Sequence, residues 1–441
     1  MSQTNKQNGS IIAIVTMFFL YAMISFVTNL GAPIGVIWKN QPEIGGSNVL
    51  GIMGNFMNFF AYLFMGIPAG KMLTKVGYKK TALIGIAVGF FGVLIQYLSG
   101  HSSGIPGFCI YLLGAFISGF SVCILNTVVN PMLNLLGGGG NRGNQLNMIG
   151  GTLNSLAGTL TPMLVGALIG TVTASTKMAD VNLVMYIAMT VFAAAFVILL
   201  FIPIQDPEMG KVTADTVFEH SPWSFRHCLL GVIAIFVYVG VEVGIPGGLN
   251  FYLSDTTANG AWVNPEAVAN AATIGGAVAA MYWLLMLVGR LCSSVIAAKV
   301  SSRQLMLATT FIGMILIVAA MLTPKSVTVS MPLFSILEGS FSTVVVPLSA
   351  LLLVLCGLCT SVMWASIYNL ATEGLGKYTA QASGIFMMMM VGGGVLPVVQ
   401  NFFADFMGYM PSYFVYLLAM AYMFYYALIG CKNVNKDIPV D

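Results

Sequence analysis

Long apolar stretches separated by short polar connections dominate the pattern of this chain. A helix needs about 20 apolar residues to span the hydrocarbon core of a bilayer, and twelve stretches meet that length. We expect helices near 11–37, 49–70, 81–99, 108–136, 146–170, 182–204, 228–253, 269–298, 305–323, 343–371, 384–407 and 412–430. Barrel strands are shorter and alternate apolar with polar residues, so the pattern predicts an all-α integral membrane protein.

The placement of basic residues indicates how these helices are oriented. Only 7% of the 441 residues are charged, and cytoplasmic loops of membrane proteins carry an excess of Lys and Arg. With the N-terminus inside, only Lys39, Lys177 and Lys325 fall in outer connections. We therefore expect both termini in the cytoplasm. The first apolar run lacks a small-residue cleavage pattern, and we interpret it as a retained helix.

The midpoint of the chain divides the helices into two groups of six. The longest hydrophilic connection runs over 206–226, and a weak repeat places KVGYK (75–79) after the second helix and KVSSR (299–303) after the eighth. Repeated halves are typical of transporters whose substrate site lies near the midplane between them. We predict an N-terminal six-helix bundle at 1–205, a cytoplasmic linker at 206–226 and a C-terminal six-helix bundle at 227–441.

Two charged residues fall well inside predicted helices, where charge is costly, whereas Asp405 lies near the outer end of the eleventh. Glu242 lies deep in the seventh helix and Arg290 lies in the eighth. A carboxylate near the bilayer centre costs roughly 2.5 to 3.5 kcal/mol, so it usually faces a bundle interior or a water-filled cavity. Counted at about 1.5 Å per residue along straight helices, the two charges lie at different depths, and we expect no direct ion pair. Arg290 is instead expected to line the inner half of a cavity or to lock a cytoplasmic gate through Glu373.

Carboxamide and aromatic side chains recur in the predicted helices. Carboxamides offer both donors and acceptors to sugar hydroxyls, and aromatic rings offer a flat apolar face to a sugar ring. Buried Asn residues also bond helix to helix; that alternative stays open for each one, although their number favours a polar cavity. The candidate substrate-binding residues are Asn29, Asn55, Asn58, Tyr62, Asn126, Asn130, Asn154, Tyr238, Glu242, Tyr282, Trp283, Trp364, Asn369 and Gln400.

The remaining reactive side chains do not form a catalytic pattern. The three His residues fall in predicted loops or at a helix end, and Cys356 and Cys359 have CxxC spacing without the second ligand pair of a metal site. The seven Cys residues give no disulfide framework. We therefore expect no catalytic residues, metal or cofactor, and not an enzyme. The expected partners are a small molecule and the lipid bilayer, with no nucleic acid, and the chain shows no dimerisation signal, so we expect a monomer.

Several motifs together resemble a known transporter family. They are IPAG (67–70), TVVNP (127–131), NSL (154–156), YVGVEV (238–243), YW (282–283), GR (289–290), IYNLATEGLGKYTAQASG (367–384) and VGGGVLP (391–397). By their joint spacing the chain resembles the major facilitator superfamily. Within it, the chain is similar to the fucose/hexose branch of sugar:proton symporters, which includes bacterial glucose/galactose and L-fucose transporters. The resemblance implies two six-helix halves related by pseudo-two-fold symmetry.

The loop after the second helix resembles the gate loop of this family. It carries Lys75 and Lys79, but Thr74 occupies the position where many members have an acid. Plain anchoring of the loop on the positive inner side explains the lysines equally well. The candidate gate residues are Lys75, Lys79, Arg290 and Glu373.

The resemblance also bears on the energy source. Fucose-type members couple to protons through acids in the first and fourth helices, and the matching residues here, Asn29 and Asn126, do not titrate. Hexose-type members carry the seventh-helix Glu, which Glu242 matches. We expect Glu242 to couple transport to H⁺, because burial favours the neutral form of a carboxyl group and so permits proton exchange. A Na⁺ ligand and a structural role remain the alternatives.

Together these features predict a secondary active transporter in a bacterial inner membrane. It would import a neutral sugar, a hexose, deoxyhexose or N-acetylhexosamine, by alternating access. An uncoupled sugar facilitator or exchanger is the main alternative, followed by an exporter of amphipathic compounds. The sequence does not identify the sugar.

Overall fold

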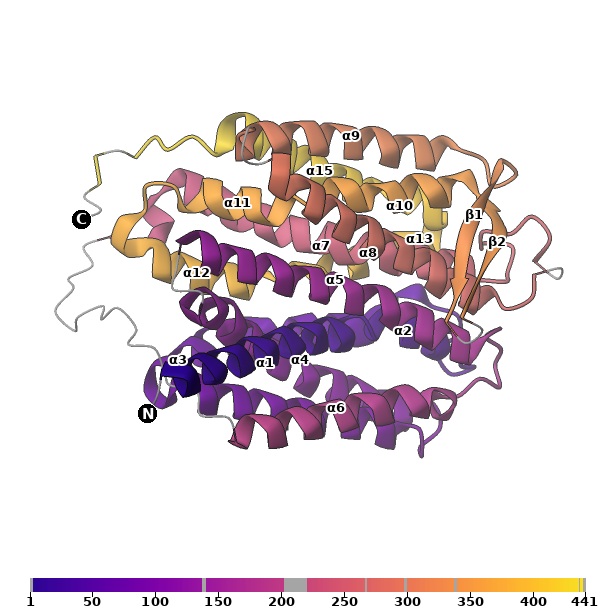
Figure 1. The fold of residues 1–441 in the computed structure, drawn as a ribbon. Helices are drawn as coiled ribbons and strands as arrows, with labels where there is room; N and C mark the ends of the chain where they lie inside the picture. The colour runs from indigo at the N-terminus through magenta and orange to yellow at the C-terminus, as the bar shows by residue number, and fades with distance from the viewer. Residues whose placement is uncertain are drawn as a thin grey trace.

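The described part of the chain forms a bundle of long helices (Figure 1). The computed structural model describes residues 3–136, 140–201, 220–265, 268–296, 300–336, 339–435 and 437–438. Within these residues, twelve helices are long and apolar enough to cross a membrane. They are Ile11–Lys39, Asn48–Leu73, Lys75–Ser99, Gly104–Leu133, Ile149–Ile169, Met178–Phe201, Arg226–Ser254, Ala271–Ser293, Ser302–Leu322, Leu348–Thr372, Gln381–Met407 and Tyr409–Gly430. The predicted all-α membrane fold with twelve spans is confirmed.

The first six spans lie together on one side of the bundle, and we call them the N-half (Figure 1). Its elements are α1 (Gln3–Thr28), α2 (Gly31–Lys39), α3 (Asn48–Ser99), α4 (Gly104–Leu136), α5 (Gly140–Ile169), η1 (Met178–Val181) and α6 (Asn182–Phe201). The first predicted helix is thus divided into α1 and α2. Conversely, α3 contains two spans and is kinked at Gly77, close to where they meet, with a φ of 83°. Glycine adopts that conformation readily, whereas other residues are strained by it.

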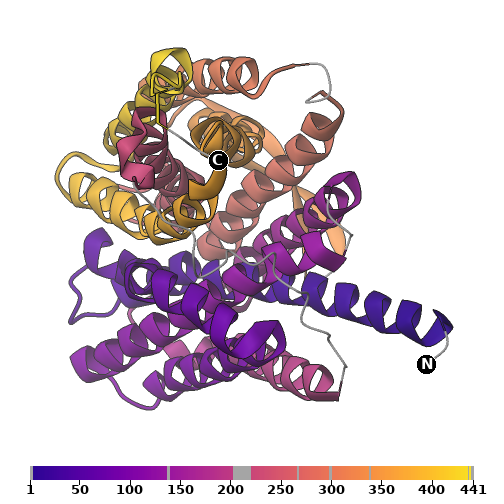
Figure 2. The ribbon, with the colours of Figure 1, turned by 90° about the vertical axis from the view of Figure 1, so that its left-hand side faces the viewer.

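The last six spans lie on the other side, and we call them the C-half. Its elements are η2 (Pro222–Ser224), α7 (Arg226–Ser254), α8 (Ala271–Ile296), α9 (Ser302–Leu322), β1 (Thr328–Ser335), β2 (Ser340–Pro347), α10 (Leu348–Thr360), α11 (Met363–Thr372), η4 (Gly376–Tyr378), α12 (Thr379–Met389), α13 (Gly392–Met407), α14 (Tyr409–Ser412), α15 (Phe414–Tyr425) and η5 (Tyr426–Gly430). The view turned by 90° shows the same two groups (Figure 2). Most of the predicted linker, 206–219, lies outside the described residues.

The two ends of the bundle are distinct. At one end, the terminal face, α1 begins and η5 ends; at the other, the hairpin face, the antiparallel strands β1 and β2 cross the ends of the helices (Figure 1). Because the chain enters and leaves at the same face, it crosses the bundle an even number of times, as the twelve spans require.

The β-hairpin corrects the predicted start of the tenth helix at 343. The apolar run there is continuous with the helix, but Val344, Val345 and Val346 pair with β1, and α10 begins only after Pro347. Three consecutive β-branched residues fit a pleated strand, and proline is accepted at the start of a helix. The apolar run therefore continues through a change from strand to helix.

Helices α5 and α8 touch near the hairpin face through two glycines. A Cβ atom at Gly276 would lie 2.2 Å from the carbonyl oxygen of Pro162, and one at Gly166 would lie 2.5 Å from that of Ala272. The hydroxyl of Thr273 donates to the carbonyl of Gly166 at 3.0 Å. The backbones of the N-half and the C-half are thus in direct contact here. We call the boundary between the two halves the seam.

Polar side chains from both halves also meet at the hairpin face. Nζ of Lys39 lies 2.7 Å from Oδ2 of Asp255, and these side chains are 9% and 6% exposed. Lys39 also donates to the hydroxyl of Tyr409, which in turn bonds Oδ1 of Asn48 at 2.7 Å. Asp405 of α13 accepts from the backbone amide and the side chain of Asn48 at 2.9 and 2.7 Å. These bonds join the halves, so the bundle is closed at the hairpin face.

Candidate functional site

A cavity of about 660 Å³ lies in the seam between the halves, and helices of both contribute to its wall. Residues of α1, α3, α4 and α5 line it from the N-half, and residues of α7, α8, α9, α11 and α12 from the C-half. Ser293, which ends its span, and Ser302, which begins α9, place one end of the cavity near the terminal face. The cavity therefore extends toward the terminal face while the hairpin face is closed.

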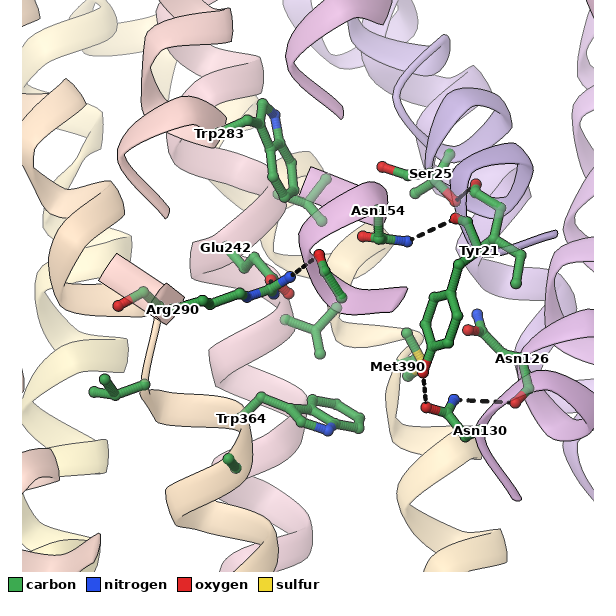
Figure 3. Close-up of a pocket in the computed structure, with 18 of the residues that line it drawn as sticks. Tyr21, Ser25, Asn126, Asn130, Asn154, Glu242, Trp283, Arg290, Trp364 and Met390 are labelled. Atoms are coloured by element: carbon green, nitrogen blue, oxygen red, sulfur yellow. Dashed lines mark hydrogen bonds and ion pairs between the residues drawn. The ribbon is translucent and has the colours of Figure 1, made fainter. Parts of the chain in front are cut away.

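Three carboxamides on the N-half side face the cavity, and each is held by a hydrogen bond to its own half (Figure 3). Asn126 donates to the hydroxyl of Tyr62 at 2.7 Å, and Asn130 donates to the carbonyl of Asn126 at 3.1 Å. Asn154 donates to the carbonyl of Tyr21 at 3.1 Å, and the hydroxyl of Tyr21 donates to Oδ1 of Asn130. These bonds fix the direction of the side chains, and a carboxamide has further donors and acceptors for a ligand.

Aromatic rings face these carboxamides from the C-half. Figure 3 shows Trp283 and Trp364 across the cavity from Asn126 and Asn130. Behind Trp364 lies the buried ring of Tyr238, with 6.2 Å between the ring centroids. Two flat apolar faces thus lie opposite the carboxamides, the combination that a sugar ring with several hydroxyls requires.

Glu242 and Arg290 form an ion pair in the wall of the cavity. Nη2 of Arg290 lies 3.2 Å from Oε1 of Glu242, and the side chains are 26% and 14% exposed. The other terminal nitrogen of Arg290 donates to the carbonyl of Gly151 at 3.1 Å and to the hydroxyl of Ser155 at 2.9 Å, both in α5. Arg290 therefore connects the C-half carboxylate to the N-half.

This geometry corrects one sequence prediction. The expectation of no ion pair was wrong, because counting residues along straight helices ignored the tilt of α7 and α8 and the length of the Arg side chain. In the state described here the acidic partner of Arg290 is Glu242, and a lock of the cytoplasmic gate through Glu373 stays a prediction. The carbonyl of Glu373 accepts from Nε2 of His227 at 2.9 Å. Arg290 does line the cavity, as expected.

The structure separates the predicted substrate-binding residues into two groups. One group lines the cavity: Asn29, Tyr62, Asn126, Asn130, Asn154, Glu242, Trp283, Trp364 and Asn369. The other group does not line it: Asn55, Asn58, Tyr238, Tyr282 and Gln400.

The residues of the second group make hydrogen bonds within the protein. Buried polar residues often join neighbouring helices in this way. Asn55 donates to the carbonyl of Gly393 at 2.9 Å, and Asn58 donates to that of Ala115 at 3.4 Å. Tyr238 and Tyr282 bond the backbone carbonyl and the hydroxyl of Thr360, at 3.3 and 2.8 Å. Gln400 donates to the hydroxyl of Ser412 at 2.7 Å. In the described state these five residues therefore lie behind the wall of the cavity, and their role in substrate binding stays a prediction.

The predicted loop lysines lie away from the cavity. Lys79 donates to the carbonyl of Leu200 at 2.9 Å, within the N-half, and Lys75 is exposed. Sequence reasoning missed Tyr21 and Ser25, which line the cavity from α1. Together with Asn29 they follow a four-residue spacing, so they lie on one helical face; that spacing was the available signal.

Comparisons with known proteins are consistent with this architecture. The model of the family described as Major Facilitator Superfamily matches residues 10–398. A glucose/galactose transporter of Brucella abortus (biovar 1, strain 9-941) is 28% identical over 439 residues, which cover 98% of this chain and 97% of that protein. The L-fucose-proton symporter of Escherichia coli (strain K12) is 22% identical over 425 residues, which cover 90% of this chain and 87% of that protein.

Solved structures agree on the fold. A transporter structure described as FucP in the outward conformation superposes with a TM-score of 0.66 and 17% identity, covering 96% of this chain and 100% of that one. The nucleoside transporter NupG superposes with a TM-score of 0.64 and 13% identity, covering 95% of this chain and 98% of that one. At such identities the likeness concerns the fold alone.

Proposed function

The chain belongs to the Major Facilitator Superfamily, a family of transporters and not of enzymes, and from this premise we propose that it imports a neutral sugar by alternating access. The observation that carries the proposal is the composition of the cavity. Asn126, Asn130 and Asn154 face Trp283 and Trp364 across it. This arrangement suits hydroxyl groups on a ring with one flat apolar face.

The chemistry of the wall favours a neutral ligand. The charged residues among its described lining residues, Glu242 and Arg290, neutralise each other in the ion pair. The volume of about 660 Å³ is ample for a monosaccharide. The printed names of the relatives, a glucose/galactose transporter and an L-fucose-proton symporter, support a hexose, a deoxyhexose or an N-acetylhexosamine as the substrate class.

The proposed cycle moves two bundles, 1–205 and 227–441, against each other, joined by a cytoplasmic linker at 206–226. We place the terminal face in the cytoplasm of a bacterial cell, within its inner membrane, because the basic residues favour that orientation. In this orientation the cavity extends toward the cytoplasm and the hairpin face is closed to the outside. Sugar would enter when the contacts of Lys39, Asp255 and Asp405 open, and would leave in the state described above.

Glu242 is the proposed coupling residue and H⁺ the proposed coupling ion. Proton coupling in a relative, the L-fucose-proton symporter, supports the ion. The first-helix and fourth-helix positions hold Asn29 and Asn126, which cannot carry a proton. Protonation of Glu242 would weaken its pair with Arg290, whose other bonds reach Gly151 and Ser155 of the opposite half. Proton transfer to or from Glu242 would thereby change the contacts of Arg290 across the seam, which must open during the transport cycle.

Counterflow in proteoliposomes tests the proposed substrate class. Vesicles holding the purified chain would be loaded with one unlabelled sugar and diluted into the same sugar in radiolabelled form, with D-glucose, D-galactose, L-fucose and N-acetyl-D-glucosamine compared. We expect transient, saturable accumulation of at least one of them, blocked by excess unlabelled substrate. Absence of counterflow for every sugar, from a chain that retains its melting transition, would refute the proposal.

A further inference from the structure

A second, much smaller cavity lies beside the cavity of about 660 Å³, which we call the sugar cavity after its proposed ligand. The small cavity is on the side of the hairpin face. Its volume is about 20 Å³, enough for one water molecule or an ion of similar size. Thr28, Asn29, Val243 and Trp283 line both cavities, so the two adjoin. The N-half and the C-half both contribute to its wall, and the small cavity therefore exists only while the hairpin face is closed.

Side chains from the N-half offer oxygen atoms to this small cavity. Asn29 donates its amide hydrogens to the backbone carbonyl of Ser25 at 2.9 Å and to the Ser25 hydroxyl at 3.1 Å, and Asn55 donates to the carbonyl of Gly393 at 2.9 Å. The hydroxyl of Thr28 donates its hydrogen to the carbonyl of Ile24 at 2.8 Å. Among the described residues no donor bonds Oδ1 of Asn29 or of Asn55. The donors of Thr28 and Asn29 are thus occupied, one of the two amide hydrogens of Asn55 is bonded, and all three residues have an oxygen acceptor available.

The backbone adds a further acceptor at the same place. Pro162 and Pro246 lie inside α5 and α7, and Pro33 lies in the first turn of α2, just after the break between α1 and α2. Proline has no N–H, so the carbonyl of Asn29, four residues before Pro33, does not have that partner. Asn29 itself lines the small cavity. The break between α1 and α2 thus brings a backbone carbonyl to the cavity, as broken helices do where transporters bind Na⁺.

We propose that the small cavity binds a monovalent cation of the size of Na⁺. Its lining residues include no Asp or Glu side chain, so the neutral oxygens suit a single positive charge better than a divalent ion, which is usually held by carboxylates. One water molecule can donate only two hydrogen bonds, fewer than the acceptors available. Asn250 is the one lining carboxamide whose Oδ1 is already bonded, by the hydroxyl of Ser254 at 3.0 Å.

The cation bridges the halves and so stabilises the state that is closed at the hairpin face. This consequence for the cycle rests on the proposed function, with the cation acting beside the proposed proton carrier Glu242. Binding of the cation itself does not depend on the sugar, and it is measured without sugar.

Thermal unfolding of the purified full chain tests the site. The melting temperature would be followed against NaCl, with choline chloride holding the ionic strength constant, and the series repeated with KCl. We expect a saturable rise with NaCl and a smaller one with KCl. Thr28→Val removes one oxygen at nearly constant volume and should raise the half-saturating NaCl concentration at least tenfold. Thr127→Val is the matched control, since Thr127 is also half-buried, bonds the carbonyl four residues earlier at 2.9 Å and lines neither cavity.

Two outcomes would overturn the proposal. Equal responses to sodium, potassium and choline chloride would mean that the cavity holds a water molecule only, and an unchanged response in Thr28→Val would place the cation elsewhere. If Thr28→Val does not fold, binding of radioactive sodium to the wild-type chain decides, since no saturable binding refutes the site. Sodium binding without counterflow of any sugar would refute the proposed function alone, and sugar counterflow without sodium binding would refute this inference alone.

Discussion

Arg290 pairs with Glu242 at 3.2 Å between Nη2 and Oε1, within the wall of the sugar cavity. The same guanidinium bonds Gly151 and Ser155 of α5, which belongs to the opposite half. Loss of the charge on Glu242 therefore changes the environment of a residue that joins the two halves. This relationship connects the proposed proton site to the seam, and it is the reason why we propose Glu242 as the coupling residue.

Asn154 is expected to contribute directly to sugar binding. It lines the cavity, and replacing it with Ala removes hydrogen bonds worth about 0.5 to 1.5 kcal/mol each, which raises the half-saturating sugar concentration in counterflow about two- to tenfold. Asn58→Ala is the matched control, because Asn58 also donates to a backbone carbonyl but lies outside the cavity. An equal loss of affinity in both variants would contradict the assignment of Asn154.

The pair of Lys39 and Asp255 is expected to hold the hairpin face closed. Both side chains are buried, and removing one partner of a buried pair costs about 3 to 5 kcal/mol because the other charge stays uncompensated. Lys39→Met or Asp255→Asn should therefore open this face, whereas the double variant should recover most of the closed state. The reporter is maleimide labelling of Ala272→Cys, a position 3% exposed in the closed seam, in a chain whose exposed Cys109 and Cys292 are replaced by Ser.

Labelling should accelerate on the order of a hundredfold or more in each single variant. Unchanged labelling in both single variants would show that the ion pair does not control the hairpin face. If labelling is as fast in the double variant as in the single ones, the uncompensated charge is not the cause of the opening.

The same pair predicts a pH dependence. Burial alone would raise the pKa of Asp255, but the Lys39 ammonium and the bonds from Thr257 together hold that pKa below its ordinary value. A lowered pKa in the folded state gives stability that is present above the ordinary value, about 3.9, and is lost as the pH falls through the lowered one. The difference in melting temperature between wild type and Asp255→Asn should stay constant from neutral pH to about 4 and shrink below it. A difference that already shrinks near pH 6 would contradict this assignment.

The β-hairpin is expected to restrain the seam. Leu333 and Phe334 of β1 pack against a cluster formed by Met163 of α5 and by Ala277 and Ala280 of α8, so the cluster contains residues of both halves. Cross-linking Met163→Cys to Leu333→Cys with a short bis-methanethiosulfonate, which joins two thiols through disulfide bonds, should stop counterflow, and reduction of these disulfides should restore it. A cross-link between Phe334→Cys and Phe341→Cys, which are paired within the hairpin, is the control and should leave counterflow intact. Counterflow that survives the first cross-link would mean that this contact need not open.

The twelve spans could be predicted from sequence because each is a long apolar run, and length alone separates such a run from a strand. The strand before α10 could not, since Val344, Val345 and Val346 continue the apolar run without a break. Only pairing with β1 separates the strand from the helix, and pairing is a property of the folded chain.

Within the candidate site, residue types were predictable and their orientation was not. Asn55, Asn58 and Tyr62 share one helical face by spacing, yet only Tyr62 lines the sugar cavity. The orientation of α3 against its neighbours decides which part of that face meets the cavity. The contact of Arg290 with Glu242 likewise depends on helix tilt and side-chain length, which helical spacing does not contain.

Uphill sugar uptake by Glu242→Gln is the most direct test of the central claim. Gln keeps the size of the side chain but cannot carry the proton, so proteoliposomes with an inward proton gradient should lose uphill uptake of the sugar found by counterflow, while counterflow itself persists. Glu43→Gln, at an exposed position outside the cavity, should keep both activities. Proton-driven uphill uptake that persists in Glu242→Gln would contradict the assignment of Glu242 as the coupling residue.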